Sequence, residues 1–225
     1  EGNDSVILCG PPRSGVSSLL LHAEALATES RKSAVLVDLA APGLNNIQAV
    51  LQRIAERLSG EPAQTIEDTS PESLVTLVRD LGKPVLLLFD NAELLCRLAE
   101  RDSHLAARFT AALREMVQKG DGAALIFGLH DQEKLRKGLP VFSGMSRLAS
   151  AGDLSMDAAS QALESALDGK AALKHQARDL LAGLSGGQPC LLQHLGFAAV
   201  ERMNSAATNL LEPELAEQAA EDLVQ

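Results

Sequence analysis

The sequence predicts an α/β fold with a parallel sheet, followed by a smaller region made of helices alone. Short apolar segments without polar–apolar alternation take turns with helical patterns, as in strands buried on both faces of a parallel sheet. After Gly152 we find only helical periodicity and no strand pattern. We therefore expect an α/β domain over residues 1–152 and a helical domain over residues 153–225.

The predicted strands are runs of aliphatic residues bounded by turn residues. They cover residues 5–9, 34–39, 85–89 and 123–129, with a weaker pattern over 147–151. The predicted helices carry apolar residues at spacings of three and four. They cover residues 16–28, 45–58, 71–81, 92–100, 104–119, 131–138, 157–167, 170–184, 189–203 and 213–223.

Composition and charge narrow the classes of partner. The net charge of -10 argues against a broad nucleic-acid surface, which needs clustered Lys and Arg. No segment approaches the roughly 18 consecutive apolar residues of a membrane span, so we expect no membrane partner. Cys9, Cys96 and Cys190 lie far apart and fit no metal-ligand spacing, which indicates buried thiols and a cytoplasmic protein.

A predicted strand, a glycine-rich turn and a helix start meet at residues 10–18, GPPRSGVSS. The spacing fits the phosphate-binding loop G-x-x-x-x-G-K-[ST], in which backbone N–H groups and a helix N-terminus hold an anion. Ser17 is at the position that ligates Mg²⁺, but Val16 stands where the pattern has Lys. The predicted nucleotide-binding residues of this loop are Gly10, Pro11, Pro12, Arg13, Ser14, Gly15, Val16, Ser17 and Ser18.

Val16 lacks the ammonium group that neutralises β- and γ-phosphates. Losing such a charge-assisted contact costs about 1.5–3 kcal/mol of binding, or roughly tenfold to a hundredfold in affinity. The chemical step loses about 10²–10³ more if the lysine acts like other preorganised charges. We therefore expect weak binding of ATP or ADP with Mg²⁺ and impaired or absent hydrolysis, with Arg13 as a possible substitute charge.

The third predicted strand ends in Asp90, within the segment VLLLFDNAE. An Asp at the end of such a strand holds Mg²⁺, so Asp90 and Ser17 are the candidate metal ligands. Related ATPases usually place next a Glu that orients the attacking water, but Asn91 occupies that position and cannot accept a proton. Glu93 is a nearby substitute, and Asn91 and Glu93 are the candidate catalytic positions. His130, which follows the fourth strand, is a candidate nucleotide sensor.

These segments resemble those of the AAA+ superfamily of P-loop ATPases, in particular its STAND and archaeal-type members. SVILCGPPRSGVSSLL resembles their Walker A opening, VLLLFDNAELL their Walker B segment, and LSGGQPCLLQHLG the G-x-P segment of the STAND lid. The resemblance implies a P-loop NTPase sheet in the order 5-1-4-3-2, a small C-terminal helical lid, and adenine nucleotide with Mg²⁺ between them. It also implies nucleotide contacts from Gly187 and Pro189, residues that a helix cap and a helix start explain equally well. Val16 and Asn91 make both Walker motifs degenerate, and no convincing arginine finger is present.

The sequence leaves several functions open. The first is a nucleotide-binding regulatory or scaffolding switch with impaired hydrolysis, which has protein partners or self-associates. The second is an active ATPase, which uses Arg13 and Glu93 or whose natural lysine has been exchanged for Val16. The third is a protein-interaction platform that binds no nucleotide. A weaker resemblance of residues 35–58 to origin-recognition ATPases adds an ATPase subunit of that kind.

Overall fold

The computed structural model describes residues 5–62, 68–118, 123–131, 133, 144, 146–168 and 170–223. Its backbone contacts divide the chain into two compact units. The first unit comprises residues 1–11 and 16–151, and the second comprises residues 12–15 and 152–225. Each unit is described by itself.

The first unit is a parallel α/β structure. Its elements in chain order are β1 (Ser5–Cys9), α1 (Val16–Glu29), β2 (Ser33–Asp38), α2 (Ile47–Ser59), α3 (Pro71–Asp80), β3 (Val85–Asp90), α4 (Leu94–Arg101), α5 (Ser103–Gln118), β4 (Ala123–Leu129) and β5 (Ser146–Ser150). All four strand pairings are parallel and the order is β2-β3-β4-β1-β5. This is the predicted order 5-1-4-3-2 counted from the opposite edge, so the predicted fold class is confirmed. The helix predicted over 131–138 falls almost entirely outside the described residues.

Local sequence signals fix where several helices begin. The Asn46 side chain accepts a hydrogen bond from the backbone N–H of Ala49 and caps α2. Ser70 caps α3 in the same way, and Pro71 occupies the first turn, where its missing N–H costs nothing. Two elements begin one or two residues from their predicted starts: β2 begins at Ser33 instead of residue 34, and α4 begins at Leu94 instead of residue 92.

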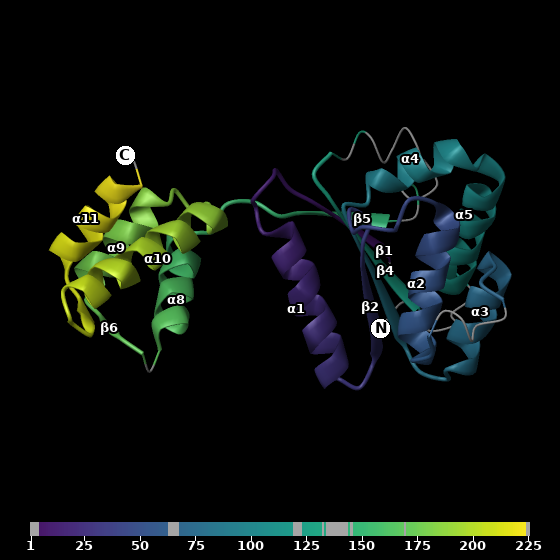
Figure 1. Cartoon of the computed structure of the whole chain (residues 1–225), viewed down its shortest axis with the longest axis horizontal. Coiled ribbons are helices and arrows are strands. Elements are labelled where there is room, and N and C mark those ends of the chain that lie inside the picture. The colour runs from purple at the N-terminus through teal and green to yellow at the C-terminus, as the bar shows by residue number, and fades with distance from the viewer. Residues whose placement is uncertain are drawn as a thin grey trace. The chain divides into compact units, whose positions relative to one another are not determined.

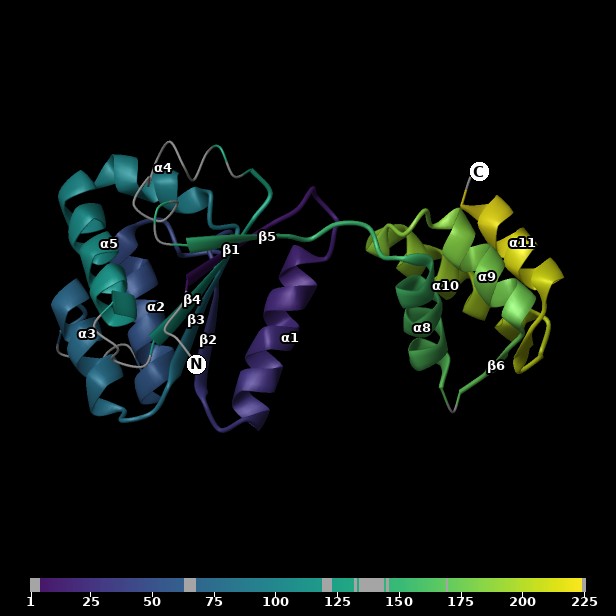
Figure 2. The same cartoon turned by 180° about the vertical axis from the view of Figure 1, so that it is seen from behind.

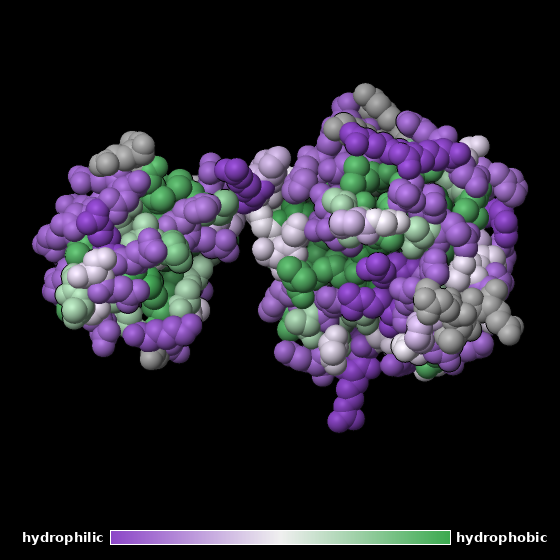
Figure 3. Space-filling view, in the orientation of Figure 1, coloured by the Kyte–Doolittle hydropathy of each residue, from purple (hydrophilic) through white to green (hydrophobic). Residues whose placement is uncertain are grey.

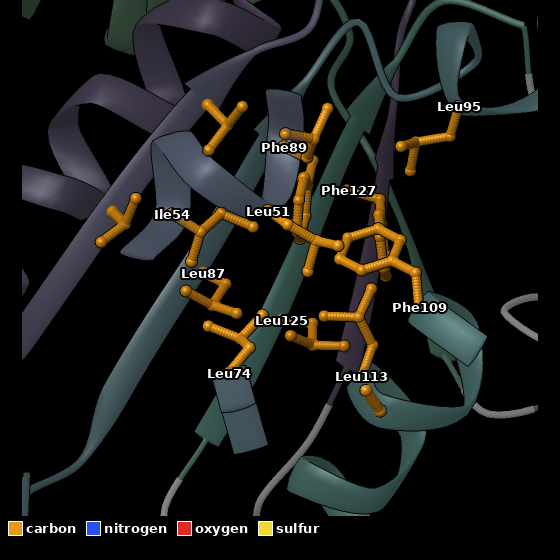
Figure 4. Close-up of a cluster of buried hydrophobic side chains, with 14 of the residues drawn as sticks. Leu51, Ile54, Leu74, Leu87, Phe89, Leu95, Phe109, Leu113, Leu125 and Phe127 are labelled. Carbon is orange, nitrogen blue, oxygen red and sulfur yellow. The ribbon is translucent and has the colours of Figure 1, made fainter. Parts of the chain in front are cut away.

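Helices cover both faces of the sheet. Helix α1 packs on one face against β2, β3 and β4, while α2, α3 and α5 lie on the other face (Figures 1 and 2). The second face holds the centre of the core, where Phe89 stacks on Phe127 at 5.3 Å and meets Phe109 edge-on at 6.4 Å (Figure 4). The remaining members of this core are almost all aliphatic, as the composition predicts.

Helix α1 lies unusually close to β4 at Gly128. A Cβ atom at Gly128 would lie 2.6 Å from Leu20 Cδ1 and 2.9 Å from Val16 Cγ1. Contacts this short do not occur between real side chains, so the absence of a side chain at Gly128 allows the first turns of α1 to reach the sheet. Helix α1, which begins at Val16, is thereby held against β4.

The second unit packs helices around its own aliphatic core. Its elements are α8 (Met156–Leu167), β6 (Ala172–Leu173), α9 (His175–Leu184), α10 (Pro189–Ser205), β7 (Leu210–Leu211) and α11 (Pro213–Asp222). The helix predicted over 170–184 is wrong at its start, and the expectation of no strand here is also wrong. Ala172 N–H donates to the Asn209 carbonyl at 2.7 Å and Lys174 N–H to the Leu211 carbonyl at 3.2 Å, so a distant segment draws these residues into a short parallel pair.

Both units carry apolar residues on the surface, visible as green areas among purple ones in Figure 3. In the first unit, Leu19, Leu21 and Leu26 of α1 are 47–57% exposed. In the second unit, Phe197 of α10 is 66% exposed. Within the described part of the chain, no helix combines the length and the apolar character needed to cross a bilayer.

Candidate functional site

The carboxyl ends of three neighbouring strands bring the predicted site residues of the first unit together. The loop follows β1, Asp90 ends β3, and His130 follows β4, which lies between them. In open parallel sheets, ligands bind outside this edge of the strands. The spatial grouping of Gly10, Asp90 and His130 is therefore the arrangement that a ligand site of this fold requires.

The loop backbone is shaped to present N–H groups. Arg13 and Gly15 adopt positive φ angles of 71° and 88°. Among the described residues, the backbone N–H groups of Arg13, Ser14 and Gly15 have no hydrogen-bond acceptor. The first N–H groups of α1, from Val16 onward, lack intrahelical partners in any helix. Free backbone N–H groups are the feature that anion-binding nests share, so phosphate binding by residues 10–18 stays a prediction.

The Ser14 side chain adds an orphaned polar atom at the same place. Ser14 is 7% exposed, and its hydroxyl oxygen has no hydrogen-bond partner among the residues that the structure describes. Buried hydroxyls are nearly always paired in folded proteins, and a missing partner calls for a ligand or a water. The free N–H groups and the Ser14 hydroxyl together fit a bound phosphate.

Val16, at the lysine position of the loop pattern, is packed against the sheet. It is 1% exposed and its Cγ1 lies against Gly128 of β4. Apolar methyl groups therefore stand at the position where the loop pattern has a lysine. Arg13, Ser17 and Ser18 are exposed, so these three side chains are accessible at the loop surface.

Asn91 is held by a contact that the sequence did not reveal. Its side-chain Nδ2 donates to Asp38 Oδ1 at 2.8 Å, while its backbone N–H donates to Asp90 Oδ1 at 3.0 Å. Asp38 is the register partner of Asp90 on the neighbouring strand β2. Asn91 also has a φ of +55°, a left-handed conformation that Asn tolerates and that Glu adopts at a cost. A glutamate here would be strained and would oppose the Asp38 carboxylate.

Asp90 and Glu93 are both partly withdrawn from solvent. Asp90 is 8% exposed at the end of β3. Glu93 precedes α4, and its Oε2 atom is buried without a hydrogen-bond partner within the described ranges. The turn that carries them is tied to β4, because Ala92 N–H donates to the Gly128 carbonyl at 2.9 Å. Both carboxylates therefore belong to the carboxyl edge of the sheet.

His130 contacts the loop directly. Its Nδ1 lies 3.0 Å from the carbonyl oxygen of Gly10, and the backbone N–H of Gly10 donates to the Leu129 carbonyl at 3.2 Å. Since a carbonyl oxygen only accepts hydrogen bonds, Nδ1 carries the proton. Two hydrogen bonds therefore join Gly10, where the loop begins, to Leu129 and His130 at the end of β4.

The predicted lid residues lie in the second unit. Gly187 has a φ of +80°, and a Cβ there would lie 2.3 Å from the backbone oxygen of Leu154. Leu154 N–H donates to the Gly187 carbonyl at 2.7 Å, and Gly187 N–H donates to Ser185 Oγ at 3.1 Å. Pro189 opens α10. These contacts give Gly187 and Pro189 a sufficient structural explanation, and their contact with nucleotide stays a prediction.

Two residues at this edge were missed by sequence reasoning. Asp38 was detectable as an acidic residue at the end of an apolar strand, like Asp90. Gly128 had no signal apart from being a glycine inside a strand, which often marks a close approach of backbone. Across the described ranges, no group of three or more His, Cys, Asp or Glu side chains is arranged to hold a metal ion. A Mg²⁺ ion at this edge would therefore need a bound phosphate to supply part of its ligands.

Comparison with solved structures shows that this chain shares its fold with an ORC2 protein and a RuvB protein. The ORC2 protein of Aeropyrum pernix in its ADPNP–ADP complexes matches 98% of this chain with a TM-score of 0.70 and 15% identity. The RuvB Holliday junction branch migration motor of Thermotoga maritima matches 98% of this chain with a TM-score of 0.64 and 12% identity. This chain spans 62% of the length of each of them, and identities this low establish the fold alone. No protein-family model matches the sequence, and no curated protein matches it.

Proposed function

We propose that this chain is an adenine-nucleotide-binding module of the AAA+ or STAND type in which ATP hydrolysis is impaired or absent. The observation that carries the proposal is the loop: its N–H groups and the Ser14 hydroxyl lack acceptors within the described part of the chain. A phosphate supplies acceptors for all of them at once, next to the N-terminus of α1. The solved ORC2 protein, which shares the fold, binds ADP and ADPNP.

The site residues divide into binding, metal and impaired catalytic positions. Loop residues 10–18 hold the phosphates, and Asp90 with Ser17 ligates Mg²⁺ that the phosphates bring, which is the usual way Mg²⁺ is bound. Impaired hydrolysis follows from two positions that differ from a working site. Val16 packs on the sheet, and Asn91 is engaged by Asp38. Residues 1–152 form the nucleotide-binding domain in this proposal, and residues 153–225 form the lid.

Isothermal titration calorimetry with ATP and ADP, each with Mg²⁺, tests binding. We expect weak binding of both nucleotides, which Mg²⁺ strengthens for ATP. Asp90→Asn is expected to remove the Mg²⁺ effect, while Asp38→Asn, the matched change at the neighbouring strand end, leaves it in place. No heat of binding at millimolar nucleotide defeats the proposal.

A bound nucleotide that is hydrolysed slowly or never suits a regulatory or scaffolding switch. Hydrogen exchange of residues 153–223 with and without nucleotide tests this role, because a switch requires that the two states differ in protection. Identical exchange in saturating nucleotide and in its absence contradicts the switch while leaving nucleotide binding intact.

A protein-interaction platform is the second candidate, and the exposed apolar residues favour it. Leu19, Leu21 and Leu26 are exposed on α1, and Phe197 is exposed on α10. Leu19 and Leu26, seven residues apart, share one face of α1, and apolar residues that gather on one face mark interaction surfaces more often than singly scattered ones do. A nucleotide-free protein whose self-association or partner binding is unchanged by added ATP would favour this candidate over the first.

A further inference from the structure

We infer that an apolar groove between α8 and α10 of the second unit is a docking site for a basic amphipathic helix of a partner protein. The inference goes beyond nucleotide binding and depends only on residues of the second unit. The groove holds a cavity of about 370 Å³. This volume lies within the range of about 300–1,000 Å³ that binding pockets in proteins have.

The spacing of small side chains on two neighbouring helices creates the groove. Ala162 and Ala166, which line it, are four residues apart and share one face of α8. Gly196 and Val200 have the same spacing on α10 and also line it. A Cβ atom at Gly196 would lie 3.5 Å from Leu163 Cδ2, so α10 passes close to α8 at this point. The groove therefore has a floor of short side chains, with space above them for the side chains of a partner.

The lining of the groove is apolar, and an exposed aromatic ring belongs to it. Every described residue that lines the cavity is apolar except Gln193. Phe197 is 66% exposed, although a ring of this size gains free energy when it leaves water. Large side chains that pack into apolar pockets carry most of the binding energy of protein interfaces. Phe197 is therefore the expected anchor of the docking site.

The walls of the groove favour a helix as the bound segment. Helices α8 and α10 use their interior N–H and C=O groups for their own hydrogen bonds, so they offer a partner only side chains. An extended segment in the groove would bury its backbone polar groups without partners, whereas a helix satisfies its own. The partner is thus a helix that presents apolar residues at spacings of three and four.

The charge of the second unit determines the charge of the partner. Residues 152–225 carry eleven acidic and four basic side chains, a net charge of -7 in a third of the chain. Three of the four basic residues, Lys174, Arg178 and Arg202, already form ion pairs with carboxylates of the same unit. Glu201 is exposed one turn beyond the aromatic ring on α10, and no described residue forms an ion pair with it. Lysine or arginine beside the apolar residues of the partner is therefore expected to strengthen and speed its binding.

A labelled synthetic peptide of about 18 residues, long enough to form a helix, tests the docking site on the whole chain without nucleotide. Its leucines have helical spacing and its lysines flank them. One control peptide has the same composition with scattered leucines, and the other has glutamate in place of lysine. Fluorescence anisotropy is expected to show micromolar binding of the first peptide, and binding at least about tenfold weaker for both controls.

Variants of the chain locate the peptide. Phe197→Ala is expected to weaken binding by about thirtyfold or more; circular dichroism checks that this exposed position leaves the fold intact. Met156→Ala is the matched control, because Met156 is 48% exposed on α8 and does not line the cavity, so its affinity is unchanged. Glu201→Gln is expected to weaken binding by about twofold to fivefold and to reduce its dependence on salt.

The outcomes separate this inference from the proposed nucleotide site. No binding at millimolar peptide, equal binding of the peptide with scattered leucines, or unchanged binding by a folded Phe197→Ala chain overturns the docking site. Equal binding of the acidic peptide overturns the basic character of the partner. Self-association in sedimentation velocity that Phe197→Ala abolishes assigns the groove to a second copy of this chain and also overturns the inference. Each of these results leaves the calorimetric test of nucleotide binding standing.

Discussion

Replacing Val16 with lysine separates binding from catalysis in this site. Val16 is 1% exposed and packs on Gly128, so the change removes one buried branch methyl, worth about 0.8 kcal/mol of folding free energy. The lysine stem keeps the remaining contact while its ammonium group reaches out to the loop. We expect nucleotide to bind about tenfold to a hundredfold more tightly, and the unliganded protein to be less stable by about 1 kcal/mol.

Hydrolysis is not expected to return with the lysine. Asn91 still has its left-handed backbone and its hydrogen bond to Asp38, and it cannot take a proton from water. Adding Asn91→Glu places a strained residue there, at a cost of about 1–2 kcal/mol, and sets two carboxylates against each other. Asp38→Asn is expected to recover part of that cost.

A steady-state phosphate-release assay measures turnover, calorimetry measures affinity, and chemical denaturation measures stability. Clear turnover by Val16→Lys alone would refute this reasoning, since it would show that Asn91 does not limit hydrolysis. It would favour instead an active ATPase whose lysine was exchanged. Tighter binding without turnover is the expected result.

Two further predictions concern the second unit. Gly187→Ala is expected to destabilise that unit by about 2–4 kcal/mol, because it adds a clash with the backbone oxygen of Leu154 to the strain of a positive φ. The neighbouring Gly186→Ala has open space around it and should cost only about 1–2 kcal/mol. Equal losses of unfolding free energy for the two variants on chemical denaturation would contradict the close contact between Gly187 and Leu154. The hydrogen bond from Arg202 lowers the pKa of Asp222, so this pair stabilises the fold above the ordinary Asp pKa and loses that effect as pH falls through the lowered value. Arg202→Ala should raise the pKa of Asp222 in an NMR titration, and an unchanged titration would speak against the contact.

The strands and the loop were predictable because their signals are local. Val85–Phe89 is apolar throughout, which requires burial on both faces, and Gly10 to Ser17 has a fixed spacing. The order of the strands was predicted instead from the resemblance to the AAA+ superfamily, because the residues of one strand do not indicate which other strand pairs with it. The short strand Ala172–Leu173 was mistaken for helix, because its pairing with Leu210–Leu211 is decided by a segment far along the chain.

The details of the site depend on contacts between elements, and sequence spacing does not encode them. The hydrogen bond of Asn91 to Asp38 joins strands separated by two helices. The close approach of Val16 to Gly128 depends on how α1 lies on the sheet. His130 was predicted as a candidate sensor from its place after a strand. Its hydrogen bond to the Gly10 carbonyl could not be predicted, because it depends on the pairing of β1 with β4.

Amide chemical shifts measured by NMR during a titration with Mg²⁺–ADP test the central claim most directly. If the loop holds a phosphate with its backbone, the resonances of Arg13, Ser14 and Gly15 shift together and saturate with the calorimetric affinity. Unmoved resonances for these three residues at millimolar nucleotide would contradict it, whatever other part of the chain responds.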